Sequence, residues 1–322
     1  MKAIVVREIG GPEKLILEEV AYPSPGNNDL LVDVTAAGLN YVDTYHRGGL
    51  YPMDLPMTPG LEGAGEVIAI GSGVEGFTVG DKVAWADALG SYSAQHLVPA
   101  SEAIPIPAGM DESVVAAVVL QGLTAHYLAI DTFPLAKGDR CLIHAGAGGV
   151  GLLLTQIAKI RGAEVISTVG SDEKAELSRA AGADHVIVYS RDDFKKAVED
   201  RFGNNAIDVV YDGVGASTFM GGLDLLRPRG MMVSFGNASG PPPEVSPLIL
   251  LQKGSLYLTR PTMVHYLQTR DELLSRTNDL FDWIGTGDLE VRIGAEYALA
   301  DAADAHRALE GRKTTGKVLI RP

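Results

Sequence analysis

The sequence contains little cysteine and little positive charge, and it has no long apolar run. Its one cysteine, Cys141, excludes an intrachain disulfide and a cysteine-rich zinc site, which fits a reducing cytoplasm. Lysine and arginine number 27 against 41 acidic residues, the reverse of the basic footprint of nucleic-acid-binding proteins. The longest uninterrupted apolar stretch, residues 114–120, is far shorter than the ~20 residues that span a bilayer. We therefore expect neither a nucleic-acid partner nor a membrane span.

The 322 residues are 46% hydrophobic and 21% charged, as in globular proteins, and their number is enough for about two domains. Up to residue 120, short β-branched segments alternate with Gly, Pro and Asp turns, which predicts a β-rich domain. From residue 138, short apolar strands alternate with helices, which predicts a doubly wound parallel sheet of the α/β class. A long helix over roughly 264–284 is followed by segments that resemble the first domain. The α/β domain, 124–264, is thus predicted to be inserted into a β-rich domain made of 1–123 and 265–322.

A glycine motif follows the first strand of the α/β domain and begins a helix. Gly146-x-Gly148-x-x-Gly151 has the order expected of a dinucleotide-binding turn. In such a turn the first glycine permits the tight bend, the second lets the pyrophosphate approach the backbone, and the third lets the helix pack closely. The alternative is an ordinary glycine-rich turn between a strand and a helix.

The end of the next strand bears on which nucleotide is bound. An NAD-binding unit presents an acid there, but this strand ends in Val169-Gly170-Ser171, with Lys174 shortly after. A missing acid beside a cation favours the 2′-phosphate of NADP, although Lys174 could equally be a solvated helix lysine. Tyr189, at the end of the following strand, could reach the adenosine phosphate or cap a loop.

Motifs along the whole chain resemble one family. The segments 36–52 (AAGLNYVDTYHRGGLYP), 59–67 (PGLEGAGEV), 144–154 (HAGAGGVGLLL) and 305–320 (AHRALEGRKTTGKVLI) are similar to the zinc-free, zeta-crystallin-like quinone oxidoreductases of the medium-chain dehydrogenase/reductase superfamily. This resemblance implies a GroES-like catalytic domain, a Rossmann domain that binds NADPH, and hydride transfer to a quinone. It also implies a homodimer, which could form through the edge strand at 254–260.

Zinc is not expected. Zinc-dependent relatives carry a cysteine near the start of the segment that here reads Gly38-Leu39-Asn40, and a histidine where this chain has Leu61. Catalytic zinc needs about three protein ligands, and the remaining histidines show no ligand spacing.

The resemblance also implies residue roles. Asn40, Tyr45 and Tyr51 would lie at the acceptor and donate hydrogen bonds to its oxygen, and Thr124 would lie near the nicotinamide amide. Asn40 could instead be a turn or cap residue, Tyr51 a half-buried tyrosine and Thr124 a helix cap. The implied cofactor residues are Tyr41, Tyr127, Gly146, Gly148, Gly149, Val150, Gly151, Gly170, Ser171, Lys174, Tyr189, Phe235, Gly236, Asn237, Thr262, Met263, Val264 and Arg312.

Two other functions remain open from the sequence. A reductase of α,β-unsaturated carbonyls would use the same hydride chemistry, because substrate choice depends on the shape of the site. A non-catalytic NADPH-binding protein would share the fold, since fold does not fix function. The acidic charge balance argues against an RNA-binding role, and the presence of Asn40 and Tyr51 favours catalysis.

Overall fold

The computed structural model describes residues 1–322, which form two compact units. The first contains 1–121, 268–281 and 291–322, and the second contains 122–267 and 282–290. Residues 282–290, which the sequence analysis assigns to the β-rich domain, pack with the second unit. Two contacts explain this: Trp283 stacks on His126 with ring centroids 5.7 Å apart, and Gln156 donates to the carbonyl oxygen of Glu290 at 3.0 Å.

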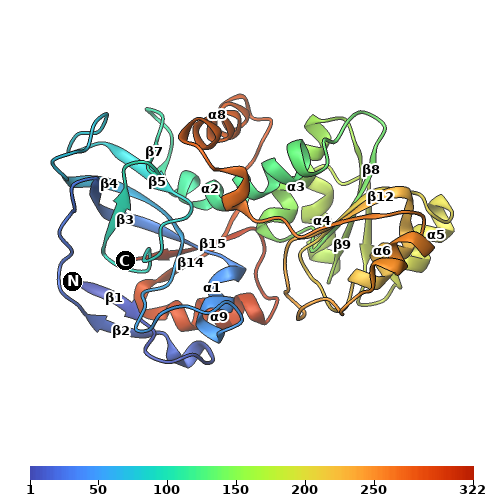
Figure 1. Cartoon of the computed structure of the whole chain (residues 1–322), viewed down its shortest axis with the longest axis horizontal. Helices are drawn as coiled ribbons and strands as arrows, with labels where there is room; N and C mark the ends of the chain where they lie inside the picture. Colours follow the sequence, from blue (N-terminus) through green and yellow to red (C-terminus); the bar gives the residue numbers. More distant parts are fainter. The chain divides into compact units, whose positions relative to one another are not determined.

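The first unit is built on a seven-stranded sheet that both ends of the chain share. Its order is β14-β15-β3-β4-β5-β7, and β6 also pairs with β3. The C-terminal strand β15 runs antiparallel to β3, with Leu319 opposite Gly38 (Figure 1). A separate hairpin joins β1 (Lys2–Val5) to β2 (Ile16–Glu19). The sheet strands are β3 (Asp29–Leu39), β4 (Glu62–Ile70), β5 (Lys82–Trp85), β6 (Gln95–Pro99), β7 (Ile104–Pro105), β14 (Ile293–Ala298) and β15 (Lys317–Arg321). The β-rich prediction is confirmed.

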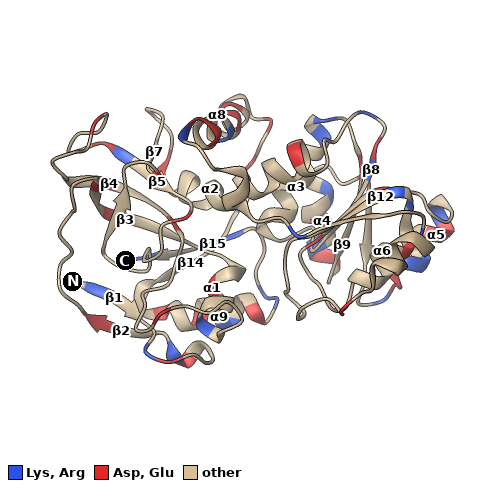
Figure 2. Cartoon of the chain, viewed as in Figure 1, with Lys and Arg blue, Asp and Glu red and all other residues tan.

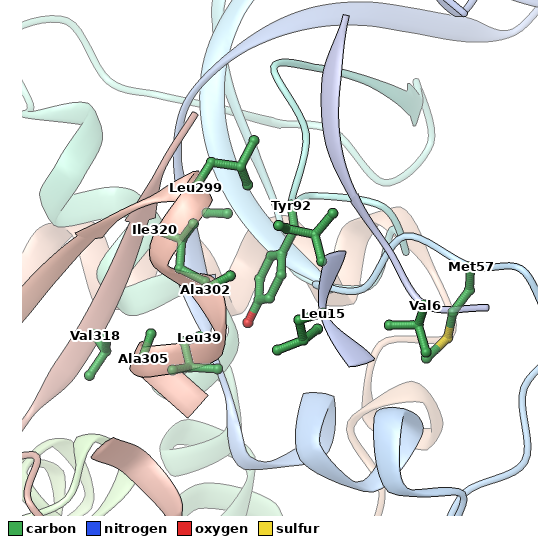
Figure 3. Packing of buried hydrophobic residues seen from close by; sticks show 12 residues of the cluster. Val6, Leu15, Leu39, Met57, Tyr92, Leu299, Ala302, Ala305, Val318 and Ile320 are labelled. Atoms are coloured by element: carbon green, nitrogen blue, oxygen red, sulfur yellow. The ribbon is translucent and has the colours of Figure 1, made fainter. Parts of the chain in front are cut away.

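A buried cluster joins the two chain ends. Figure 3 shows Tyr92 at its centre, with Ala302 and Ile320 on one side and Leu15 on the other. These side chains come from segments far apart in the sequence, so their burial holds the C-terminal strand and helix on the N-terminal sheet.

Two of the helices outside the doubly wound sheet, α2 and α8, begin at side-chain caps. Asp111 accepts a hydrogen bond from the backbone N–H of Ser113 at 2.7 Å at the start of α2, as expected for a cap. The long helix α8 begins at Arg270, later than expected, because the N–H groups of Gln268 and Thr269 donate to the Glu272 carboxylate. The elements are η1 (Pro12–Lys14), α1 (Tyr41–Gly48), α2 (Glu112–Tyr127), η3 (Met263–Tyr266), α8 (Arg270–Thr286), η4 (Leu299–Asp301) and α9 (Ala302–Glu310).

One helix is long and apolar enough to pass a length-and-composition test for a membrane span. It consists of α2 and its π-helical continuation η2 (Leu128–Thr132). However, 78% of its apolar window is buried within the structure, which is typical of a core helix.

The second unit contains the predicted doubly wound sheet. Its six parallel strands lie in the order β10-β9-β8-β11-β12-β13, so the chain runs outward from β8 and then returns to its other side at β11. In such sheets, ligands bind at the carboxyl ends of the strands beside this reversal. The elements are β8 (Arg140–His144), α3 (Gly149–Ile160), β9 (Glu164–Val169), α4 (Asp172–Ala180), β10 (His185–Val188), α5 (Phe194–Phe202), β11 (Ile207–Asp212), α6 (Phe219–Leu225), β12 (Leu226–Ser234), α7 (Pro247–Gln252) and β13 (Tyr257–Thr259).

Helices α5 and α6 cover one face of this sheet. Val198 of α5 and Phe219 of α6 pack on Leu142 and Ile166, residues of two adjacent strands. The outer side of α5 is polar and carries charges of both signs, including Lys196 bound to Asp200 at 2.8 Å (Figure 2). The fold therefore has the apolar-in, polar-out pattern of a packed α/β layer.

Candidate functional site

The glycine turn of the second unit leads from β8 into α3. A Cβ on Gly146 would collide with Ser167 of β9, and a Cβ on Gly151 would collide with the carbonyl oxygen of Ala145. The left-handed backbone conformation falls on Ala145, at φ 56°, so Gly146 is needed for close approach rather than for its φ. A Cβ on Gly148 would meet only the Ala145 oxygen, at 3.2 Å. Internal packing therefore leaves the backbone of Gly148 approachable.

The turn ends at the N-terminus of α3. Gly148 is the N-cap, with extended backbone, and Gly149 and Val150 are the first helical residues, each half-buried. The N–H groups of this first turn and the helix dipole favour an anion. A pyrophosphate fits this arrangement, since glycine keeps side chains away from the helix start.

Polar side chains form a rim around the tip of β9, and Asp172, the first acid after this strand, is held in an ion pair. Ser171 caps α4 by accepting from the backbone N–H of Lys174 at 3.3 Å. The carboxylate of Asp172 is bound to the guanidinium of Arg191. The Tyr189 hydroxyl lies above Gly170, where an added Cβ would be 2.8 Å away. The structure thus brings four predicted residues and Arg191 to one strand edge.

Arg191 is a residue that sequence reasoning missed. The one feature of the sequence that could have indicated it is its position: it is a cation two residues after Tyr189, in the loop that follows β10. Since it neutralises Asp172, the first acid after β9, it changes the electrostatics of the rim directly.

Phe235, Gly236 and Asn237 follow β12, as predicted. A Cβ on Gly236 would collide with the carbonyl oxygen of Gly213, so this loop lies tightly against the end of β11. Arg260 donates to the carbonyl oxygens of Ser234 at 3.0 Å and Gly236 at 3.1 Å, which fixes the loop from the side of β13.

A further group of predicted residues lies at the end of α2 and around η3. Tyr127 is buried and stacks on Tyr266 with ring centroids 4.4 Å apart; burial raises the pKa of its phenol. Thr124 lies inside the last turns of α2 rather than at a cap. Thr262 directly precedes η3, in which Met263 and the exposed Val264 are the first residues.

The predicted acceptor residues Tyr45 and Tyr51 lie in the first unit, on α1 and the loop that follows it, beside Tyr41, a predicted cofactor residue. The rings of Tyr41 and Tyr45 are 5.7 Å apart, and those of Tyr45 and Tyr51 are 5.2 Å apart. All three tyrosines are half-buried. Their edge and tilted contacts hold the phenol rings as one aromatic group.

Asn40 caps α1 and is almost fully buried, at 4% exposure. Its amide nitrogen donates to the carbonyl oxygen of Gly38 at 3.2 Å and to the Glu62 carboxylate at 2.8 Å. Its amide oxygen accepts from Gln121 at 3.1 Å and from the ammonium of Lys317 at 2.9 Å. Both amide hydrogens are therefore already donated within the chain.

A second buried polar network lies behind α1. Asp43 accepts from the backbone N–H of Asn40 at 2.8 Å and from the hydroxyl of Tyr92 at 2.9 Å. Burial raises the pKa of Asp43 to about 7 despite these donors. His306 contacts Arg47 at 2.9 Å, and burial lowers the pKa of its imidazole to about 3. The imidazole is therefore neutral near pH 7.

Two remaining predictions concern metal and Arg312. No group of three or more His, Cys, Asp or Glu side chains is placed to hold a metal ion. Metal independence itself stays a prediction. Arg312 lies in the first unit, exposed, two residues after the end of α9 and with a left-handed φ of 57°.

Comparison with known proteins identifies the family. The family described as zinc-binding dehydrogenase matches residues 149–279, and the alcohol dehydrogenase GroES-like domain matches 26–132. A quinone oxidoreductase of Pseudomonas aeruginosa is 45% identical, over 100% of this chain and 99% of that protein. The chain belongs to the quinone oxidoreductase family.

Solved structures agree with this family assignment. The crystal structure of Escherichia coli quinone oxidoreductase complexed with NADPH superposes with a TM-score of 0.98, at 42% identity and over 100% of both chains. A family relative with another substrate is the 2-haloacrylate reductase of a Burkholderia species, 40% identical over 99% of this chain and 98% of that protein. These comparisons confirm the resemblance to the quinone oxidoreductase family. They also confirm the predicted fold class, a Rossmann-type domain inserted into a GroES-like domain.

Proposed function

We propose that this protein is an NADPH-dependent quinone reductase. The observation that carries the proposal is the similarity, over the whole length of both chains, to a quinone oxidoreductase crystallised with NADPH. The rim at the end of β9 supports the choice of NADPH over NADH, because Arg191 neutralises Asp172 beside Lys174.

The residues of the second unit would bind the cofactor. The first turn of α3 would hold the pyrophosphate through backbone N–H groups, and Lys174 and Tyr189 would bind the 2′-phosphate. Further contacts are proposed for Tyr41, Tyr127, Gly170, Ser171, Phe235, Gly236, Asn237, Thr262, Met263, Val264 and Arg312, with Thr124 near the nicotinamide amide. When bound, NADPH supplies the hydride that reduces the acceptor.

The residues of α1 and its following loop would orient the acceptor. Reduction of a quinone develops negative charge on its oxygen, and a phenol hydroxyl can donate a hydrogen bond there. Because the two amide hydrogens of Asn40 are donated to Gly38 and Glu62, we assign the donor role to Tyr51 and Tyr45. Asn40 would form the wall of the site and hold the start of α1.

The proposed reaction needs no zinc. Asn40 and Leu61 stand where the resemblance implies a thiolate and an imidazole in zinc-dependent relatives, and neither side chain replaces these ligands well. A hydroquinone monoanion also needs less charge stabilisation than an alkoxide, so one or two hydrogen-bond donors would suffice.

The test is the loss of NADPH absorbance with 1,4-benzoquinone, run beside a panel of enals and with NADH as the matched cofactor control. Rapid oxidation of NADPH by the quinone and slower oxidation of NADH support the proposal. Turnover of enals alone would instead identify a reductase of unsaturated carbonyls, a candidate that the similarity to 2-haloacrylate reductase favours. Cofactor binding without turnover of any acceptor would leave only a binding protein.

The same proposal includes a homodimer in the cytoplasm, without nucleic-acid or membrane partners. Strand β13 is the edge of the parallel sheet, with Tyr257 58% exposed, and Leu251 of the preceding α7 is 66% exposed. An unpaired edge strand beside apolar side chains is suited to pairing with a second copy. Sedimentation of wild type and of a Tyr257→Lys variant tests this: the variant should be monomeric, and a monomeric wild type would contradict the dimer.

A further inference from the structure

The amide of Asn40 is held by hydrogen bonds from all sides. It has two donor and two acceptor positions, and the four contacts to Gly38, Glu62, Gln121 and Lys317 occupy them. An amide with this many partners has one orientation. If its oxygen and nitrogen were exchanged, the NH₂ group would face the donors of Gln121 and Lys317.

Two of these partners, Lys317 and Glu62, form a buried ion pair. The side chains of Lys317 and Glu62 are 1% and 0% exposed and in direct contact. Glu62 also accepts from the backbone N–H of Leu120 at 2.7 Å, which anchors the pair to α2. A Cβ on Gly38 would collide with both side chains, so glycine there is required by the pair. Burial lowers the pKa of Lys317, against the attraction of Glu62.

Such a pair is poorly explained by stability alone. Removing two charges from water costs about as much as their attraction returns, so a buried ion pair often stabilises no more than apolar residues of similar volume. Its best-attested use is to fix one arrangement among several. Here the arrangement that it fixes is that of Asn40, the residue that begins α1.

We propose that Lys317 is a positioning residue for acceptor reduction, which it controls through Asn40. This inference rests on the proposed function. The ammonium of Lys317 holds the Asn40 amide, and Asn40 sets the start of the helix that carries Tyr41 and Tyr45. Tyr51 contacts the ring of Tyr45, so a displacement of Asn40 would also displace the hydroxyl of Tyr51, the proposed hydrogen-bond donor.

The experiment compares three variants by their kcat/KM for the quinone. They are Asn40→Ala, the pair Glu62→Gln/Lys317→Met, and all three changes together. The pair variant removes both charges at once, so neither is left buried and unpaired. We expect about a tenfold loss from each of the first two, and no further loss when they are combined, because residues that act through one another are not additive.

Two controls separate positioning from general damage. The surface pair Lys14 and Glu8, whose side chains are 33% and 70% exposed, belongs to the same unit, and its matched variant Glu8→Gln/Lys14→Met should leave kcat/KM unchanged. The dissociation constant of NADPH should also change by less than about twofold in the pair variant, since the proposed phosphate contacts are in the second unit and Tyr41 is the one proposed cofactor contact on α1.

The inference is overturned if the losses multiply, because Lys317 would then act independently of Asn40. An equal loss of NADPH binding would also overturn it, since this would indicate a purely structural role.

If the pair variant does not fold, Gly38→Ala crowds Glu62 and Lys317 without changing a charge. It should give the same pattern, with Gly285→Ala, at an exposed position of α8, as its control. A wild-type protein without turnover would instead refute the proposed function, a result distinct from turnover with multiplied losses.

Discussion

The guanidinium of Arg191 binds both carboxylate oxygens of Asp172, at 2.7 and 2.9 Å. Asp172 is the first residue of α4 and the acid nearest to the tip of β9. Left alone, its charge would repel a 2′-phosphate bound near Lys174. The ion pair therefore makes the rim more favourable for NADPH without adding a direct contact.

Arg191→Ala should weaken NADPH binding by about threefold to tenfold and leave NADH binding nearly unchanged, because only NADPH carries the repelled phosphate. The loss should shrink at high salt, since both partners are largely exposed. Fluorescence titration of both cofactors measures it. Adding Asp172→Asn should recover part of the loss, and an equal effect on NADH would show that the pair only supports the fold.

Lys174→Ala should weaken NADPH by about 10–100-fold and spare NADH, as expected for the loss of one hydrogen bond to a charged group. The matched control is Lys196→Ala on α5, an exposed lysine of the same unit that is bound to Asp200. If both cofactors weaken equally, or if the control variant shows the same preference change, Lys174 does not bind the 2′-phosphate.

Local sequence patterns were sufficient to predict most of the fold. Apolar strands between helices predict the doubly wound sheet, because burial on both faces requires that pattern. The start of α8 was placed too early because Val264, Tyr266 and Leu267 continue an apolar pattern into a segment that forms η3. The true start is marked by a capping box, Thr269-x-x-Glu272, which is present in the sequence but lies outside the apolar periodicity.

The candidate site was only partly predictable for a related reason. The glycine turn and the β9 tip are contiguous in sequence, so spacing identified them. The contact between Asn40 and Lys317 joins residues 277 positions apart, and it exists because β15 pairs with β3. Lys317 is the first residue of an apolar strand, a position at which a lysine side chain is ordinarily exposed to solvent. Its burial depends on tertiary pairing, which no local pattern shows.

Metal removal should leave activity unchanged. After exhaustive dialysis against a chelator, quinone reduction should continue at the wild-type rate, because Asn40 and Leu61 do not replace a thiolate and an imidazole. Elemental analysis of the same sample provides the control for complete removal. Stoichiometric zinc in the purified protein, together with activity that the chelator abolishes and zinc restores, would contradict the prediction.

The pKa of Asp43, raised to about 7 by burial, should make stability depend on pH. The unfolded chain loses this proton near the ordinary aspartate pKa, whereas the folded chain keeps it until about pH 7. The folded state therefore binds this proton more tightly between these values, and the contribution of Asp43 to the free energy of unfolding should fall as pH rises from about 4 to 7.

The measurement is urea unfolding of wild type and Asp43→Asn across that pH range. The difference between the two free energies should change by an amount on the order of a few kcal/mol, then stay constant above pH 7. A difference that does not vary with pH would show that the Asp43 carboxyl titrates alike in the folded and unfolded chains.

The last prediction concerns the hydroxyl of Tyr51. Tyr51→Phe keeps the ring and its contact with Tyr45, so it removes only the proposed hydrogen-bond donor. Hydride transfer to a quinone is already favourable, so we expect a loss of about 10–100-fold in kcat/KM for the acceptor, below that of a full oxyanion-hole donor. NADPH affinity should be nearly unchanged.

Tyr22→Phe, at an exposed tyrosine of the same unit, is the control and should have no effect. Unaltered acceptor kinetics in both Tyr51→Phe and Asn40→Ala would mean that the acceptor does not bind against this loop. Complete loss of activity in Tyr51→Phe would instead indicate that Tyr51 donates a proton to the product, which a hydrogen-bonding role alone does not require.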